Sequence, residues 1–377
     1  KGQIRTGGLN QFAKRYLCKM NSSFECSPME NLPQGKQCWQ APSNIALVKY
    51  WGKYGLQLPK NPSLSFTLQT SVTTTEISYK PADKKTPGVS FQFLFEGETR
   101  TDFHPKLKVF FERILPYQPF LKRLDLTISS SNSFPHSSGI ASSASAYAAL
   151  AAALVSIEQS CFPDSDPSYW EQKRSFLARL GSGSAARSLQ GPMMLWGEHP
   201  AFTGSSNEFA IPFGHKLPAV FLDYQDCILL VDKGQKKVSS TLGHGLMKGH
   251  PFAEARFDQA RTNTLALATA MEAEDLEAFI QIVESEALTL HAMMQSSHPY
   301  YILMRPNTLH IIEVIWAFRA ETKIPLCFTL DAGANVHLLY PKQHQTAVDV
   351  FISEQLLEYC QDRECLKDSV GWGAKKL

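Results

Sequence analysis

A turn rich in Ser, Gly and Pro runs directly into an Ala-rich apolar segment, and this junction constrains the fold more than any other part of the chain. Residues 133–145 read SFPHSSGIASSAS, and residues 146–159 read AYAALAAALVSIEQ. Ala has the highest helix propensity, so the second part is predicted to be a helix. The free backbone N–H groups at its N-terminus suit a phosphate group. No GxxxxGK[ST] pattern is present, so a P-loop NTPase is not indicated. A simple Ser N-cap is the alternative interpretation.

Length and composition limit the class of protein. At roughly 100–200 residues per domain, 377 residues predict two domains. The 44% of hydrophobic and 19% of charged residues exclude a fibrous or disordered protein. The net charge of +2 gives no overall field for nucleic acid or an anionic membrane. The longest apolar stretch, residues 146–157, is shorter than the roughly 20 residues of a membrane span. We therefore expect no nucleic-acid or membrane partner, and local groups must bind any anionic ligand.

The cysteines and the N-terminal segment give weaker signals. The eight cysteines are scattered and include no CxxC pair, which is typical of reduced thiols in a cytosol-like compartment rather than of disulfides or zinc. Residues 1–36 are basic and have no acid before Glu25, a composition similar to an organelle transit peptide or to sequence outside the folded protein. We expect residues 1–36 to be a disordered extension.

Periodicity predicts a mixed α and β chain. β-Branched runs indicate strands, and apolar residues at helical spacing indicate helices. The expected strands are residues 45–51, 63–68, 71–79, 89–95, 124–131, 193–196, 219–224 and 227–232, with a hairpin at 327–340. Besides the Ala-rich segment, the expected helices are residues 106–115, 169–180, 252–271, 276–288, 306–318 and 346–358. The apolar run at 227–232 suits the central strand of a second sheet, so we expect domains at 37–215 and 216–377.

Four segments resemble the sequence blocks of one enzyme family. PHSSGIASSAS at 135–145 resembles the Pro-x3-Gly-[Leu/Ile]-x-Ser-Ser-Ala signature of the GHMP small-molecule kinase superfamily, whose members bind ATP on such a turn. APSNIALVKYWGK (41–53), ARLGSGSAARSLQG (178–191) and LDAGANVHLLY (330–340) resemble, in order, the blocks of the mevalonate diphosphate decarboxylase family. The resemblance implies an α+β GHMP-kinase two-domain fold. Its N-terminal domain would be similar to domain 2 of ribosomal protein S5, and its C-terminal domain would be ferredoxin-like.

The resemblance also implies a reaction. In this family ATP phosphorylates the tertiary C3 hydroxyl of mevalonate 5-diphosphate, and loss of that phosphate with CO2 gives isopentenyl diphosphate. ATP and Mg²⁺ would be the cofactors, and the enzyme would be a cytoplasmic homodimer. A decarboxylase or 3-kinase acting on mevalonate or its 5-monophosphate is the alternative. A ligand sensor without catalytic activity is less consistent with the retained Lys49, Arg187 and Asp331.

Three residues carry the catalytic roles that the resemblance implies. Asp331 would accept or orient the C3 hydroxyl proton, although an Asp at such a turn is also a common cap. Arg187 would hold the substrate carboxylate with its planar fork, against the alternative of a surface Arg. Lys49 lies where the family has a lysine near the reacting centre.

Further residues would bind the two ligands. Tyr50 and Lys53 would contact the 5-diphosphate, although a basic and aromatic strand end is also a plain structural feature. The other substrate-binding residues would be Ser182, Ser184 and Ser240, with Asn44 hydrogen-bonded behind them. The residues implied for ATP are Pro135, Ser138, Gly139, Ala141, Ser142 and Ser143, with the Ser142 hydroxyl also a candidate ligand of Mg²⁺.

One segment departs from the family pattern. After Ser240 the chain continues LGHGLMKGHPFAEARF, whereas a Gly-Met pair closes a shorter segment in the common family form. His244 and His250 either replace a cation there or cap the following helix, and we expect a cap. Contacts to the distal phosphate of the substrate depend on this segment.

Overall fold

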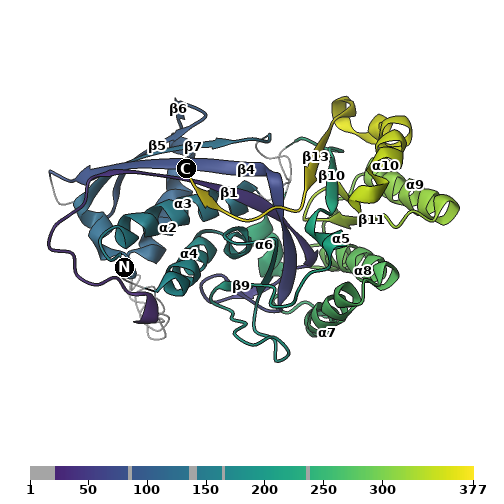
Figure 1. The fold of residues 1–377 in the computed structure, drawn as a ribbon, viewed down its shortest axis with the longest axis horizontal. Helices are drawn as coiled ribbons and strands as arrows, with labels where there is room; N and C mark the ends of the chain where they lie inside the picture. Colours follow the sequence, from purple (N-terminus) through teal and green to yellow (C-terminus); the bar gives the residue numbers. More distant parts are fainter. Residues whose placement is uncertain (1–21, 84–86, 136–141, 164–165, 235–237) are drawn as a thin grey trace, which may run out of the picture.

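The computed structural model describes residues 22–83, 87–135, 142–163, 166–234 and 238–377. A large sheet built mainly from the N-terminal part of the chain dominates one half of the molecule (Figure 1). Its strand order is β14-β1-β4-β7-β5-β6; β8 pairs with the first residues of β4, and β9 pairs with β8. Its strands are β1 (Gly35–Val48), β4 (Ser63–Pro81), β5 (Ser90–Phe95), β6 (Glu98–Thr99), β7 (Leu124–Asn132), β8 (Met193–Trp196), β9 (Ala210–Pro212) and β14 (Lys375–Lys376).

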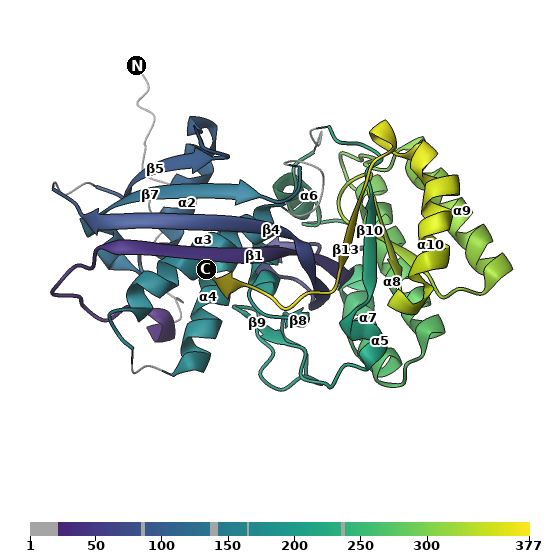
Figure 2. The ribbon, with the colours of Figure 1, turned by 45° about the horizontal axis from the view of Figure 1, so that its top comes forward.

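Three helices cover one face of this sheet (Figures 1 and 2). They are α2 (His104–Ile114), α3 (Ser142–Gln159) and α4 (Pro167–Gly181). The predicted Ala-rich helix is α3, and its seven residues from Ala148 to Leu154 are each at most 4% exposed. Small side chains allow α3 to pack closely on β1, β4 and α4 together. This packing fixes the position of its N-terminal end, where the Ser-rich turn leads in.

A smaller antiparallel sheet forms the other half of the molecule. Its strand order is β11-β12-β10-β13, with β10 (Gln225–Leu229), β11 (Cys327–Leu330), β12 (Val336–Tyr340) and β13 (Cys365–Ser369). Strands β11 and β12 are the predicted hairpin. The helices of this half are α7 (Ala253–Glu272), α8 (Leu276–Gln295), α9 (Pro306–Thr322) and α10 (Gln345–Phe351), which continues as a π-helical turn, Ile352–Leu356. The short helix α6 (Ser240–Leu246) and the β2 (Lys53–Tyr54) and β3 (Leu58–Pro59) ribbon complete the structure near the junction of the two halves.

The two halves are joined by an apolar core and by a carboxylate. The core combines Ile45, Leu64 and Phe66 of the large sheet with Phe221, Ile228 and Phe279 of the other half. Near residue 70 the register between β1 and β4 shifts, so β1 does not pair with every β4 amide there. Asp368 of β13 accepts the backbone N–H groups of Gln69, Thr70 and Ser71 at 2.9, 2.8 and 2.7 Å. β14 then returns to β1, so the C-terminal tail crosses between the halves (Figure 2).

The structure corrects several expectations. Residues 22–36 are not a free extension, because the Phe24 ring is 3% exposed and lies 4.8 Å from the Phe176 ring; residues 1–21 lie outside the described residues. The expected strands 63–68 and 71–79 are one continuous strand, β4. The expected strand 219–224 was wrong: the short helix α5 (Ala219–Leu222) lies there, because a short apolar run suits a buried helical turn as well as a strand.

Two other expectations concern the domain boundary and membrane-spanning helices. The last strand of the first half before the crossover, β9, ends at Pro212, and β10 of the smaller sheet begins at Gln225. A domain division at residue 215 stays a prediction. In the part of the chain that the structure describes, no helix combines the length and apolar character that a bilayer crossing requires.

Candidate active site

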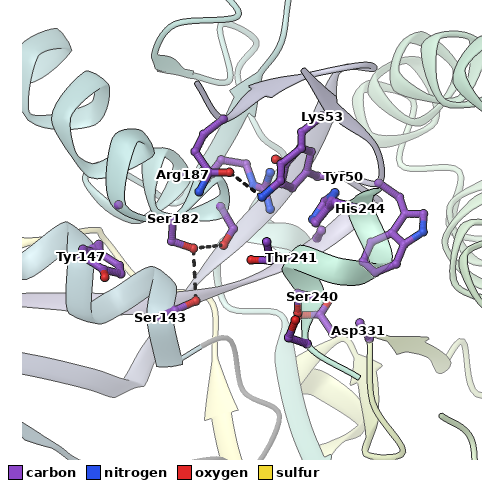
Figure 3. A pocket seen from close by; sticks show the side chains of 18 of the residues that line it. Tyr50, Lys53, Ser143, Tyr147, Ser182, Arg187, Ser240, Thr241, His244 and Asp331 are labelled. Carbon is purple, nitrogen blue, oxygen red and sulfur yellow. Dashed lines mark hydrogen bonds between the residues drawn. The ribbon is translucent and has the colours of Figure 1, made fainter. Parts of the chain in front are cut away.

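A cavity of about 660 Å³ lies at the junction of the two halves (Figure 3). Its walls come from the end of β1, the starts of α3 and α6, the loop after α4, and the turn between β11 and β12. Ten of the predicted site residues line it: Asn44, Lys49, Tyr50, Lys53, Ser143, Ser182, Ser184, Arg187, Ser240 and Asp331. The fold therefore brings together residues from all four sequence blocks.

Lys49 and Asp331 form an ion pair in this cavity, although they come from opposite halves. The Lys49 Nζ lies 3.3 Å from Asp331 Oδ1. The Lys49 side chain is 2% exposed and the Asp331 side chain 27%. Burial lowers the pKa of the Lys49 ammonium, and the Asp331 charge opposes that shift. The pair presents a partly accessible carboxylate with an ammonium fixed beside it.

Helix α8 positions both members of this pair. The Glu286 carboxylate accepts the backbone N–H of Lys49 at 2.9 Å, and His291 Nε2 donates to the backbone carbonyl of Asp331 at 3.0 Å. Arg256 of α7 forms a buried ion pair with Glu286. Glu286 and His291 are five residues apart on one helix, a rise of about 7.5 Å. A single rigid element thus fixes the separation of Lys49 from Asp331. The sequence did not single out either residue, because both lie within an ordinary periodic helix.

Arg187 is a buried cation whose partners are all neutral. Its Nη1 and Nε donate to the hydroxyls of Ser63 and Ser65 at 2.6 and 3.1 Å, and Nη2 donates to Asn44 Oδ1 at 3.3 Å. Within the described part of the chain it forms no ion pair. Burial lowers the pKa of Arg187 to about 10, so the guanidinium is still charged at neutral pH. The Asp331 charge partly opposes this shift without forming an ion pair with Arg187. Burying a charge without an ion-pair partner is costly, so the arrangement favours an anionic ligand at Arg187.

The serines form a chain of hydroxyls across the cavity. Ser143, at the start of α3, lies 3.2 Å from the Ser182 hydroxyl, which lies 3.5 Å from that of Ser184 (Figure 3). Asn44 donates to the Ser184 carbonyl at 3.1 Å. Pro135 and Ser142 do not line the cavity. The predicted ATP contacts Ser138, Gly139 and Ala141 lie outside the described residues.

Tyr50 and Lys53 lie at another wall of the cavity, next to His244. The Tyr50 hydroxyl is buried without a hydrogen-bond partner among the described residues. A Cβ at Gly183 would lie 2.8 Å from this oxygen, so only glycine lets the loop after α4 pass so close to Tyr50. The Lys53 Nζ donates to Gln57 Oε1 at 2.8 Å. Burial, followed by the charge of Arg113, lowers the pKa of Lys53.

In the segment after Ser240, His244 has neither of the two roles expected for it. Ser240 opens α6 and lines the cavity. His250 accepts the backbone N–H of Phe252, the residue before α7, at 3.1 Å, so it lies next to the helix start but bonds to no N–H of the first turn. His244 instead lies inside α6, where its Nδ1 accepts the backbone N–H of Gly52 at 3.0 Å. Burial, with smaller contributions from Lys53 and Arg187, lowers the pKa of His244 to about 3. His244 is therefore neither a cation nor a cap.

The cavity has a strong excess of positive charge. Its described lining contains a single carboxylate, that of Asp331, and the cations Lys49, Lys53, Lys106, Arg113 and Arg187. The whole chain has a net charge of only +2. Clustered charges of one sign in a partly buried site attract a ligand of opposite sign. The lining therefore suits one or more highly anionic ligands.

Comparison with known proteins agrees with this geometry. The family model described as the diphosphomevalonate decarboxylase-like N-terminal domain matches residues 41–207, and that of the mevalonate 5-diphosphate decarboxylase C-terminal domain matches residues 227–371. The diphosphomevalonate decarboxylase of Aspergillus fumigatus is 31% identical over 324 residues, which are 82% of this chain and 77% of the relative. The chain belongs to the diphosphomevalonate decarboxylase family.

Solved structures support the same assignment. One described as MDDEF in complex with MVAPP, AMPPCP and magnesium superposes with a TM-score of 0.77 at 27% identity, covering 92% of this chain and 99% of the other. The mevalonate diphosphate decarboxylase from Enterococcus faecalis gives a TM-score of 0.76 at 26% identity, with the same coverage. The expected α+β two-domain fold of the diphosphomevalonate decarboxylase family is confirmed. The roles of the individual site residues stay predictions.

Proposed function

We propose that this chain converts mevalonate 5-diphosphate and ATP into isopentenyl diphosphate, ADP, phosphate and CO2. The observation that carries the proposal is one cavity with five cations and the single carboxylate of Asp331, itself paired with Lys49. A diphosphate, a carboxylate and a nucleotide triphosphate need such an excess of positive charge. The proposed carboxylate partner is Arg187, which donates to three neutral acceptors and forms no ion pair among the described residues.

The reaction has two stages. First, Asp331 accepts the proton of the C3 hydroxyl as the oxygen attacks the γ-phosphorus of ATP, and ADP leaves. Then the C1–C2 bond breaks and releases CO2. Its electron pair forms the new carbon–carbon double bond, and phosphate leaves C3. Lys49 orients Asp331 throughout, and Arg187 holds the substrate carboxylate before it leaves.

The nucleotide is proposed to lie against the start of α3. Ser143 presents a hydroxyl to the cavity there, and the α3 N-terminus supplies backbone donors for phosphate oxygens. Mg²⁺, when bound, neutralises phosphate charge. Ser142, the first residue of α3, is its proposed protein ligand. The relative solved with MVAPP, AMPPCP and magnesium supports this set of ligands.

The test is a comparison of three substrates. Purified protein is incubated with ATP, Mg²⁺ and either mevalonate, its 5-monophosphate or its 5-diphosphate, while ADP and CO2 are followed separately. We expect both products from the 5-diphosphate. The monophosphate should have a kcat/KM lower by about one to two decades, because it loses at least one charge-assisted contact. ADP without CO2 would indicate a 3-kinase, and binding without either product would indicate a sensor; both results would refute the proposal.

Two further parts of the proposal concern assembly and location. We propose a homodimer located in the cytoplasm, as the family resemblance implies. Light scattering of the purified protein tests the first, with a mass twice the 42.1 kDa of the chain as the expected result. Imaging of the tagged full-length protein tests the second.

A further inference from the structure

We propose that His244 is a neutral hydrogen-bond donor to the diphosphate group of the substrate, and hence a specificity-determining residue. The inference rests on the proposed function, because it names a contact to that substrate. It concerns a residue that the sequence blocks shared with the family do not include.

The His244 ring is fixed in the cavity wall. It packs against the rings of Tyr50 and Trp51, with centroids 4.3 and 4.5 Å away. A Cβ at Gly243 would lie 2.6 Å from the Trp51 ring and 2.5 Å from the Tyr301 hydroxyl, so glycine is needed for α6 to approach this closely. His244 is 8% exposed and lines the cavity beside Tyr50 and Lys53 (Figure 3). The ring therefore has one orientation with one edge available to a ligand.

The hydrogen bond from Gly52 sets the tautomer. A backbone N–H can only donate, so Nδ1 of His244 must carry a lone pair to accept it at 3.0 Å. In the neutral ring the proton then lies on Nε2, at the opposite edge. Nε2 has no hydrogen-bond partner within the described residues. The ring thus offers one free N–H donor to the cavity.

The surroundings keep this donor neutral. Burial is the largest cause of the lowered pKa of His244, and the charges of Lys53 and Arg187 act in the same direction. Burial raises the pKa of the neighbouring Tyr50 hydroxyl, so this group also stays neutral. The neutral His244 ring and Lys53 therefore line the same part of the cavity. Phosphoryl oxygens carry several acceptor positions each, so a diphosphate can accept from both.

The test uses His244→Asn and His244→Gln with His250→Asn as the control. The Asn oxygen can still accept from Gly52, but no group reaches the Nε2 position; the longer Gln amide can place a donor there. His250 is also buried and also accepts a backbone N–H through Nδ1. Its Nε2, however, is hydrogen-bonded to the Met293 carbonyl, and His250 does not line the cavity. KM, kcat and the Kd of inorganic pyrophosphate are measured for each variant, together with Tm.

We expect His244→Asn to raise the KM for mevalonate 5-diphosphate and the Kd of pyrophosphate by about 10- to 100-fold, the loss of one hydrogen bond to a charged group. The KM for ATP should change by less than about twofold, because ATP is placed at the α3 side. His244→Gln should recover part of the loss, and His250→Asn should bind as the wild type does. The proposal would be overturned if His244→Asn kept the wild-type KM, or if its KM for ATP rose equally. It would also be overturned if His244→Asn and His244→Gln lost equal affinity in parallel with a fall in Tm.

The outcomes separate this inference from the proposed function. Wild-type protein that binds pyrophosphate through His244 but turns over no substrate would refute the reaction and leave the contact. Wild-type protein that turns over the 5-diphosphate with a KM independent of His244 would refute the contact alone. The substrate KM of the wild type should also show no ionisation of His244 between pH 5 and 9, since burial first, and then the charges of Lys53 and Arg187, oppose protonation of the ring.

Discussion

Arg187→Lys keeps the positive charge of Arg187 but removes its planar fork. Three different nitrogens of the guanidinium donate to three separated acceptors, on Ser63, Ser65 and Asn44. A single ammonium nitrogen cannot occupy all three positions, nor can it form two parallel bonds to a carboxylate. Losing one charge-assisted bond to the substrate costs about 1.5–3 kcal/mol, which is roughly 10- to 150-fold in kcat/KM. Loss of the hydrogen bonds to Ser63, Ser65 and Asn44 would also displace the new ammonium group, which adds to this loss of kcat/KM.

The chain offers a matched control for this substitution in Arg179. It is also deeply buried, and burial lowers its pKa to about 10, as for Arg187. Its guanidinium donates to the backbone carbonyls of Leu56 and Glu208, and it does not line the cavity. Arg179→Lys should therefore lower Tm and leave kcat/KM within about threefold of the wild type, since it removes no ligand contact.

The assay is initial-rate release of ADP and CO2 at varied mevalonate 5-diphosphate, with Tm measured for both variants. Arg187→Lys should lose about two decades of kcat/KM while its KM for ATP is little changed. Near-wild-type activity in Arg187→Lys would refute the assignment of the carboxylate to Arg187. Equal activity losses in Arg187→Lys and Arg179→Lys would mean that both act through stability alone.

Three other substitutions test neighbouring parts of the account. Ser143→Ala should raise the KM for ATP with little change in Tm, because its hydroxyl faces the cavity; a fall in Tm without a change in KM would support a simple cap. Glu286→Gln removes a charge that raises the pKa of Lys49, so the alkaline limb of kcat/KM, where Lys49 loses its proton, should move to lower pH; an unmoved limb would contradict this coupling. Asp368→Ala leaves three backbone N–H groups of β4, and that of Ser369, without this acceptor, so denaturant unfolding should show a loss of about 1–3 kcal/mol or more; unchanged stability would contradict its role in joining the halves.

Local patterns predicted the elements that carry the site, whereas the roles of the site residues were implied by the family resemblance. Asp331 follows a short apolar strand at a glycine-containing turn, and the β11–β12 hairpin places it as expected. The Ala-rich composition of residues 146–159 predicted α3, since composition alone makes such a segment a helix. Such elements depend on only a few neighbouring residues, so they can be predicted without knowledge of the tertiary structure.

The supporting residues could not be predicted in this way. Glu286 reaches the backbone of Lys49 across 237 positions of the sequence, and nothing near it in α8 distinguishes it from a surface acid. His244 depends on the backbone N–H of Gly52, 192 positions away, and so its tautomer is a property of the folded state only. The helix α5 was mistaken for a strand because four apolar residues carry no clear period.

The stoichiometry of product release in the wild type and in Asp331→Asn tests whether Asp331 accepts the hydroxyl proton in an ATP-dependent decarboxylation. With mevalonate 5-diphosphate, ATP and Mg²⁺, the wild type should release ADP and CO2 in equal amounts. Asp331→Asn keeps a similar shape beside Lys49 but cannot accept the hydroxyl proton, so both products should appear about 10²–10⁴-fold more slowly while the two ligands still bind. Release of CO2 at the wild-type rate by Asp331→Asn, or of ADP without CO2 by the wild type, would contradict the account.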